Sequence, residues 1–134
     1  MFEIVKSISF CYGHRLLNYV GPCAHLHGHN ARAEIHLKSE ILDERGMIMD
    51  FSDIKREVKT WIDDTLDHTM LLAKDDPVIP YLDDAKERYY LMDKNPTAEN
   101  IAELIFKQVE SMGYPVSAIT LWETETSYAR FSKA

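Results

Sequence analysis

The sequence predicts an α+β domain in which antiparallel strands form one sheet and two helices cover one of its faces. Alternating apolar residues at 2–10 and 29–37 indicate strands, and apolar residues at helical spacing at 52–66 and 97–112 indicate two amphipathic helices. The expected order is β-β-β-α-α-β-β, and an antiparallel sheet of this kind usually carries its helices on one face. A length of 134 residues suits a single core, so we expect residues 1–134 to form one domain.

Three histidines are expected on the inward faces of the first two strands. His14 follows the first strand at its far end and has the parity of the apolar residues in that strand. Residues 16–26 lack a period and contain Gly and Pro, which predicts a loop. In the second strand the residues from 31 to 37 alternate apolar with polar, and His27 and His29 continue the apolar parity. They should therefore lie at the end of a buried face, where a recessed site would be built.

The middle of the chain predicts a turn, a third strand and the first helix. The acidic, glycine-containing stretch 42–46 indicates a hairpin turn, and residues 47–51 are expected to return as a strand. Ser52 is the expected N-cap of a helix that ends near Leu66.

The rest of the chain predicts a long connection, the second helix and two more strands. Residues 70–95 are rich in Asp and Pro and indicate a connection with room for a short helical turn. Asn95 or Thr97 can cap the second helix, and Gly113 is expected to end it. Residues 116–131 are expected to form a bent pair of strands.

The composition bounds the classes of function. The chain is 46% hydrophobic and carries a formal charge of −7 with scattered basic residues, so it offers no footprint for nucleic acid. No signal-peptide pattern and no apolar run of membrane-spanning length is present, which predicts a cytoplasmic protein without a membrane partner. Its two cysteines are then expected to be free thiols.

The strongest local signal is the stretch Cys-Ala-His-Leu-His-Gly-His from 23 to 29. His27 and His29 share one face, and His14 on the neighbouring strand completes a three-ligand set. A catalytic zinc site typically takes three protein ligands and leaves a fourth position for water or substrate, and the ligand type favours zinc over iron or copper. His25 has the same parity and competes for the third place.

Four other residues are candidates for chemistry. Cys23 could close a structural zinc site as its fourth ligand, be an inert thiol, or react beside the metal, whereas Cys11 is expected in the core. Asp67 and His68 form either a plain helix terminus or an acid/base pair, and adjacent side chains usually diverge. Glu123 is either a solvated edge residue or a buried anchor for an amidine-like ring edge such as that of guanine or a pterin.

Taken in order, these residues resemble the 6-pyruvoyl-tetrahydropterin synthase / 6-carboxy-tetrahydropterin synthase family over nearly the whole chain. The segments that carry the resemblance are FCYGHR, CAHLHGHN, MDFSDIK, LDH at 66–68, NPTAENIA and WET. The resemblance implies that His14, His27 and His29 hold zinc, so that His25 is not expected to be a ligand. It implies further roles as follows: Cys23 is the catalytic thiol, Asp67 and His68 are its proton-relay partners, Glu123 anchors the pterin, and Thr97 and Ala98 line the pterin site.

The same resemblance implies a T-fold, a small antiparallel sheet with two helices on one face that associates into an oligomeric barrel. Such proteins are commonly homohexamers, here expected as a dimer of trimers with active sites at subunit interfaces. The three-residue gap between Cys23 and His27 resembles the bacterial 6-carboxy branch, because mammalian-type pyruvoyl synthases have a longer insertion there.

The implied enzyme is a zinc-dependent carbon–carbon lyase of 7-deazaguanine and queuosine biosynthesis. It would convert 7,8-dihydroneopterin triphosphate to 6-carboxy-5,6,7,8-tetrahydropterin with release of acetaldehyde and triphosphate. The triphosphate needs cations on an acidic protein, and Arg15 is the candidate. Two departures from the family bear on the pocket: Cys11, Tyr12 and Gly13 stand where small residues often precede the first ligand, and the 70–95 connection exceeds that of the shortest members.

Three alternatives stay open at this stage. The same fold can make 6-pyruvoyl-tetrahydropterin or cleave dihydroneopterin like an aldolase. A zinc-dependent pterin-binding or structural module without turnover would have the Cys23 sulfur as its fourth ligand. A zinc hydrolase would use Glu123 as a base near the metal.

Overall fold

The computed structural model describes residues 1–133 and has a mixed sheet with few helices. The strands are β1 (Phe2–His14), β2 (His27–Ser39), β3 (Thr69–Ala73), β4 (Tyr89–Met92), β5 (Val116–Trp122) and β6 (Tyr128–Ser132). The helices are a 3₁₀ turn (Pro22–Ala24), α1 (Phe51–Ile54), a π-helical turn (Lys55–Lys59), α2 (Thr60–Thr65), α3 (Ile79–Asp84) and α4 (Ala98–Ser111). The predicted α+β class is therefore confirmed.

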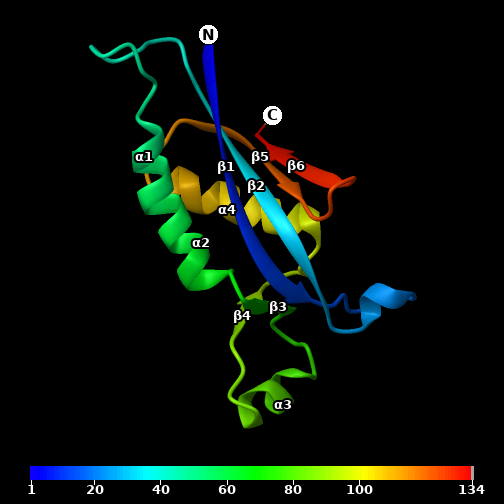
Figure 1. Cartoon of the computed structure of the whole chain (residues 1–134). Coiled ribbons are helices and arrows are strands. Elements are labelled where there is room, and N and C mark those ends of the chain that lie inside the picture. Colours follow the sequence, from blue (N-terminus) through cyan, green and yellow to red (C-terminus); the bar gives the residue numbers. More distant parts are fainter. Residues whose placement is uncertain (134) are drawn as a thin grey trace.

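The six strands form one sheet in the order β4-β3-β1-β2-β5-β6. The pairs β1–β2, β2–β5 and β5–β6 are antiparallel, as predicted. The two short strands differ from the prediction, because β3 pairs with β1 in parallel and β4 pairs with β3 in parallel. The long β1–β2 ladder crosses the molecule in Figure 1, with β3, β4 and α3 at one end of it.

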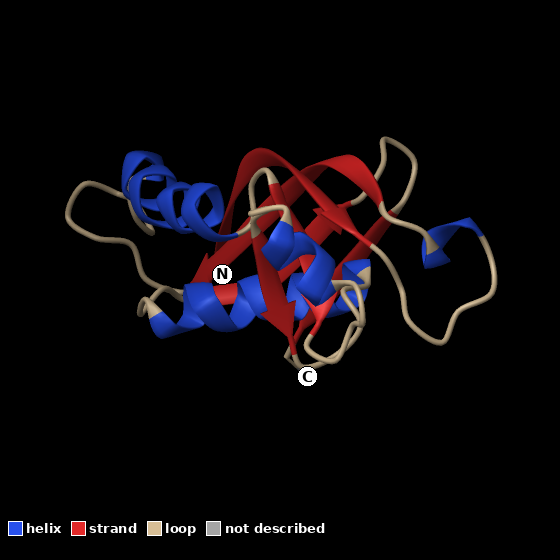
Figure 2. Ribbon diagram, turned by 90° about the horizontal axis from the view of Figure 1, so that it is seen from below, coloured by secondary structure: helices blue, strands red, loops and turns tan. Residues whose placement is uncertain are grey.

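One face of the sheet is buried against the helices. Buried strand residues such as Phe10, Ile35 and Leu121 belong to the same core cluster as Ile62 of α2 and Ile105 of α4. Because side chains alternate along a strand, a single parity of β1 and β2 supplies this core and the other parity faces away. Figure 2 shows the strands curling over the helices, and the core cluster includes residues of both.

The second predicted helix agrees closely with α4. Thr97 caps it by accepting a hydrogen bond from the Asn100 amide at 3.2 Å. Gly113, with φ of 91°, follows its end in the left-handed conformation that favours glycine. The strands predicted over 116–131 are also confirmed as β5 and β6.

The strand predicted at 47–51 is wrong. Residues 47–50 form no strand, and Phe51 already belongs to α1. The physical reason lies in Asp50, whose carboxylate accepts from the Ser52 amide at 2.8 Å. The observed N-cap is therefore two residues before the predicted one, and the helix begins at Phe51. Ile48 and Met49 pack on the core without pairing to a neighbouring strand.

The connection predicted at 70–95 contains more regular structure than expected. It holds most of β3, the short helix α3 and β4. Leu71, Leu72 and Ala73 are all buried, so this strand is covered on both faces and shows no alternation. A short apolar run of this kind is easily read as a loop.

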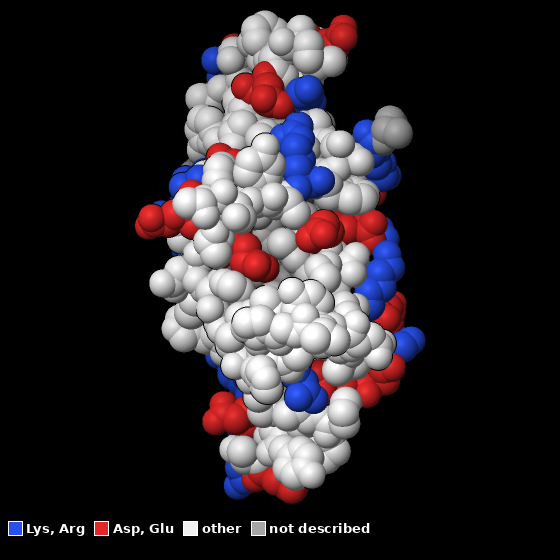
Figure 3. All heavy atoms as spheres, turned by 90° about the vertical axis from the view of Figure 1, so that its right-hand side faces the viewer, with Lys and Arg blue, Asp and Glu red and all other residues white. Residues whose placement is uncertain are grey.

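No helix in the described residues is long and apolar enough to cross a membrane. On the face drawn in Figure 3, acidic and basic side chains are interspersed around a broad uncharged area, with no continuous basic tract.

Candidate metal and substrate site

Three histidine side chains converge at the end of the β1–β2 ladder. His14, His27 and His29 each offer a ring nitrogen within 4.8 Å of the nitrogens of the other two. Their ring centroids lie 4.5 to 5.1 Å apart, and the Nε2 atoms of His14 and His29 lie 3.2 Å apart. His25 is exposed and outside this cluster.

The register of β1 and β2 builds the cluster. His14 pairs with His27, and Tyr12 pairs with His29, so the last residues of one strand stand beside the first residues of the next. Gly13 and Gly28 pair between them. A Cβ on Gly13 would lie 3.2 Å from the His27 carbonyl oxygen, and a Cβ on Gly28 would lie 3.1 Å from the Tyr12 carbonyl oxygen. Glycine therefore permits the close approach of the two strands here.

The outer nitrogens of two rings are fixed by carbonyl groups. His14 Nδ1 lies 2.6 Å from the Pro96 carbonyl oxygen, and His27 Nδ1 lies 2.7 Å from the His25 carbonyl oxygen. Because a carbonyl only accepts, both Nδ1 atoms carry the proton, which leaves a lone pair on each Nε2. The His27 Nε2 atom is buried without a hydrogen-bond partner among the described residues. Three imidazoles so arranged fit a metal ion such as Zn²⁺.

Burial keeps two of these rings neutral. Burial lowers the pKa of His14, and the Pro96 carbonyl and the Glu123 carboxylate oppose this effect only in part. Burial likewise lowers the pKa of His29. Both rings are therefore uncharged at neutral pH, the form in which imidazole binds metals.

A carboxylate and a phenol lie beside the histidines. Glu123 Oε1 is 3.6 Å from His29 Nε2, and Glu123 Oε2 is 4.0 Å from His14 Nε2. The Tyr12 hydroxyl donates to Glu123 Oε2 at 3.0 Å. Burial raises the pKa of Tyr12, and the Glu123 carboxylate adds to this, so the phenol stays protonated. Tyr12 has the same strand parity as His14, but no motif in the sequence marks it as a functional residue.

A pocket of about 370 Å³ unites five of the residues singled out from the sequence. Its lining includes His14, Cys23, Thr97, Ala98 and Glu123. The 3₁₀ turn presents Cys23, and the start of α4 presents Thr97 and Ala98. Cys23, Glu123 and His14 therefore line the same hollow.

Asp67 and His68 are joined, although adjacent side chains usually diverge. His68 Nδ1 lies 2.8 Å from Asp67 Oδ2, while the other carboxylate oxygen accepts from the Cys11 amide at 2.9 Å. The reason is the backbone: His68 has φ of 55°, and its amide donates to the Cys11 carbonyl at 2.7 Å. Burial raises the pKa of Asp67, but the Cys11 amide and His68 together hold it below its ordinary value.

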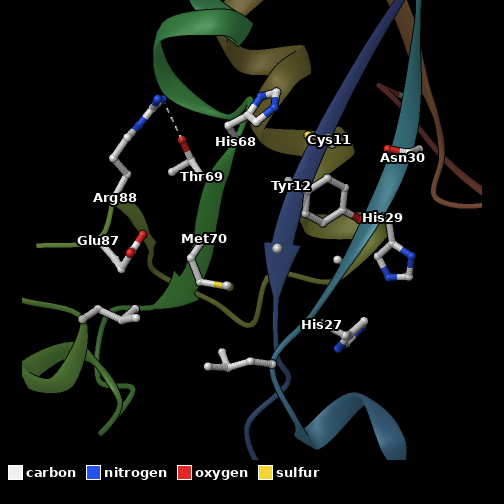
Figure 4. Close-up of a pocket in the computed structure, with 14 residues that line it drawn as sticks. Cys11, Tyr12, His27, His29, Asn30, His68, Thr69, Met70, Glu87 and Arg88 are labelled. Atoms are coloured by element: carbon white, nitrogen blue, oxygen red, sulfur yellow. Dashed lines mark hydrogen bonds between the residues drawn. The ribbon is translucent and has the colours of Figure 1, made fainter. Parts of the chain in front are cut away.

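The Asp67–His68 pair and Cys23 line different pockets. His68 lines a pocket of about 590 Å³ with His27 and His29, and both Asp67 and His68 line another of about 690 Å³. Figure 4 shows His68 beside Cys11 at one end of the first of these pockets and the two histidines at the other. Cys11 is half-buried and lines both pockets, so its predicted place in the core is wrong.

The candidate triphosphate ligand Arg15 is already paired. Its guanidinium makes a two-pronged contact with Asp76, with Nε 2.9 Å from Oδ2, and the Asp76 side chain is 0% exposed. A different arginine, Arg88, lines the 590 Å³ pocket and donates to the Asp67 carbonyl and the Thr69 hydroxyl. Arg88 is not predictable from the sequence as a pocket residue, because nothing near it in the chain connects it to the histidines.

Comparisons with known proteins indicate one family. The family model described as 6-pyruvoyl tetrahydropterin synthase matches residues 3–134. A protein of Rickettsia bellii named 6-carboxy-5,6,7,8-tetrahydropterin synthase is 35% identical, over 96% of this chain and 98% of its own length. A protein of the same name from Aquifex aeolicus is 32% identical, over 98% of both chains.

Solved structures share the fold. An uncharacterised protein from Wolinella succinogenes superimposes with a TM-score of 0.81 at 28% identity, over 99% of this chain and 98% of that chain. The 6-pyruvoyl tetrahydropterin synthase of Caenorhabditis elegans superimposes with a TM-score of 0.74 at 21% identity, over 99% and 96%, which supports the fold alone. The fold is thus the expected T-fold, and this chain belongs to the 6-pyruvoyl tetrahydropterin synthase family.

Proposed function

We propose that this enzyme is a zinc-dependent 6-carboxy-5,6,7,8-tetrahydropterin synthase. It converts 7,8-dihydroneopterin triphosphate to the 6-carboxy product with release of acetaldehyde and triphosphate, in the cytoplasm, for 7-deazaguanine and queuosine synthesis. The observation that supports the proposal is the 370 Å³ pocket, whose lining includes Cys23, Glu123 and His14. The names of the Rickettsia and Aquifex relatives support the choice of product.

His14, His27 and His29 would hold the zinc through their inner nitrogens. When bound there, zinc supplies Lewis-acid polarisation of the oxygens on the substrate side chain. The chain contributes the orientation: the carbonyls of Pro96 and His25 fix two rings so that their lone pairs face the site.

Glu123 anchors the pterin in this proposal. Its carboxylate accepts two parallel hydrogen bonds from the amidine-like edge of the ring, a charged acceptor facing two N–H donors. Thr97 and Ala98 line the same pocket at the beginning of α4. The Thr97 hydroxyl caps α4 by accepting from the Asn100 amide, which favours the helical conformation at this end of the pocket.

Cys23 and His68 move protons to and from the ring and its side chain. Cys23 already lines the pterin pocket, whereas Asp67 and His68 line other pockets of the same chain. The His68 side chain is 72% exposed, which leaves it accessible to another subunit. We therefore place the complete site at an interface between copies of this chain, in a homohexamer built as a dimer of trimers.

Incubation with 7,8-dihydroneopterin triphosphate tests the reaction. We expect acetaldehyde, triphosphate and 6-carboxy-tetrahydropterin, whereas a pyruvoyl synthase would release no acetaldehyde and an aldolase-like enzyme would leave a different pterin. Cys23→Ala should keep one zinc per chain and lose turnover, with Cys11→Ala as the thiol control. Normal turnover by Cys23→Ala would show that the Cys23 thiol is not required for catalysis.

The position of Glu123 favours one alternative, a zinc hydrolase. A carboxylate 3.6 Å from His29 Nε2 stands where a general base would activate a water. The two functions differ in ring recognition. If Glu123 is a pterin anchor, the metal-free protein binds pterin and Glu123→Gln weakens that binding. If Glu123 is a hydrolase base, the metal-free protein does not bind pterin and the substitution has no such effect. A module closed by the Cys23 sulfur is disfavoured, because the histidine group of His14, His27 and His29 does not include Cys23.

A further inference from the structure

Tyr12 is buried beside His14, His29 and Glu123 of the candidate site. Its side chain lies on the buried face of β1 and the residue is 2% exposed. Its ring packs edge-on against His14, with centroids 5.1 Å apart, and is tilted against His29 at 5.7 Å. Two of the three candidate metal ligands therefore contact the same aromatic ring.

The Tyr12 hydroxyl is directed at one atom. It donates to Glu123 Oε2 at 3.0 Å, across 111 positions in the sequence. A buried phenol needs a hydrogen-bond partner, and a charged acceptor makes this a strong bond. The bond thus links β1 to the end of β5, where Glu123 follows the last strand residue, Trp122.

Without this bond, Glu123 would be free to approach the metal position. Its two oxygens are already 3.6 and 4.0 Å from the Nε2 atoms of His29 and His14. The oxygen held by Tyr12 is the one closer to His14. A modest rotation of a released carboxylate would bring it towards the position that the three imidazoles leave open for substrate.

We propose that Tyr12 is a positioning residue, whose hydroxyl holds Glu123 in place for the pterin ring and keeps this carboxylate off the metal. The part of this inference that concerns pterin binding rests on the proposed function. The restraint on the Glu123 carboxylate does not. Tyr12 acts through Glu123 and contacts no reacting atom.

Tyr12→Phe tests the proposal, because it removes the hydroxyl and keeps the ring. Binding of pterin itself, which has no side chain that reaches the metal, is measured by fluorescence and should weaken roughly ten-fold. Release of zinc to a chelator should slow roughly ten-fold, because the freed carboxylate becomes a fourth ligand. A merely structural tyrosine would not slow metal release.

Two controls isolate the bond. Tyr89→Phe removes another tyrosine–carboxylate hydrogen bond, from Tyr89 to Asp83 at 2.7 Å, and should change neither quantity. In a Glu123→Gln background the substitution Tyr12→Phe should have no further effect on pterin affinity or zinc release, since the proposed coupling runs through that carboxylate.

The outcomes separate the two proposals. If Tyr12→Phe binds pterin and releases zinc as the unchanged protein does, the positioning role is overturned. If the unchanged protein fails to bind pterin, the proposed function fails, while the zinc-release comparison still tests the restraint on Glu123. Tyr12→Met, which fills the core without a hydroxyl, repeats both measurements should the Phe variant not fold.

Discussion

The imidazole of His68 and the carboxylate of Asp67 are hydrogen-bonded, with Nδ1 and Oδ2 2.8 Å apart, although the two residues are adjacent in the chain. The left-handed backbone at His68 turns the ring back, and the Cys11 amide holds the second carboxylate oxygen. The pair is therefore assembled within one chain before any partner arrives. The His68 side chain is 72% exposed, so its ring is accessible from outside the chain.

Asp67→Asn should lower turnover by about 10²-fold or more while zinc content stays unchanged. An asparagine oxygen can still accept from the Cys11 amide, but its NH₂ group then faces His68 Nδ1 and favours the tautomer with the proton on Nε2. Steady-state kinetics with metal analysis checks this. Asp64→Asn, at an exposed position of α2, is the matched control. Full activity in Asp67→Asn would exclude the relay.

His29→Ala should reduce zinc affinity by more than about 100-fold, since it removes one of three ligands. His25→Ala is the control from the same stretch. The His25 carbonyl, not its side chain, orients His27, so this variant should keep one zinc per chain. Competition against a chelator of known affinity measures both. Zinc loss in His25→Ala with retention in His29→Ala would reverse the ligand assignment.

The parts of the fold and the site that depend on local periodicity are predictable from the sequence. Alternation placed His27 and His29 on the inner face, and a Thr cap marked the start of α4. The rest depends on contacts between distant residues. The Tyr12 bond spans 111 positions, and the short strands β3 and β4 are parallel and buried, so they show no alternation. The Asp67–His68 contact depends on one backbone angle, which composition does not determine.

Asp76→Asn should destabilise the protein by about 3 kcal/mol at pH 7, because it leaves the Arg15 guanidinium beside a buried neutral group. The hydrogen bonds from Arg15 hold the pKa of Asp76 below its ordinary value of 3.8, against the opposing effect of burial. A carboxylate with a depressed pKa stabilises the fold above its unfolded value, and this contribution is lost as the pH falls through the folded value.

The difference in the free energy of unfolding between the unchanged protein and Asp76→Asn should therefore be full at pH 7 and shrink below pH 3.8. Urea denaturation of the metal-free proteins at pH 7 and at lower pH measures it, so that metal release does not contribute. Asp75→Asn, at the exposed neighbouring position, should change stability by less than about 0.5 kcal/mol. An equal loss in both variants would contradict a specific role for the Arg15–Asp76 pair.

A mixture of two inactive variants tests whether the site is shared between subunits. Cys23→Ala and His68→Ala should each lack turnover alone, since every site then lacks one of the two proposed proton-transfer groups. The two residues line different pockets of one chain. If Cys23 of one copy works with His68 of another, random exchange of subunits leaves about a quarter of the interfaces with both residues intact, so about a quarter of the activity should return. A mixture of Cys23→Ala with Glu123→Gln serves as the control, because both residues line the same pocket of one chain and should give much less recovery. If the first mixture stays inactive after exchange is verified by mass spectrometry, the relay does not cross the interface, and the Asp67–His68 pair must reach the substrate within its own chain.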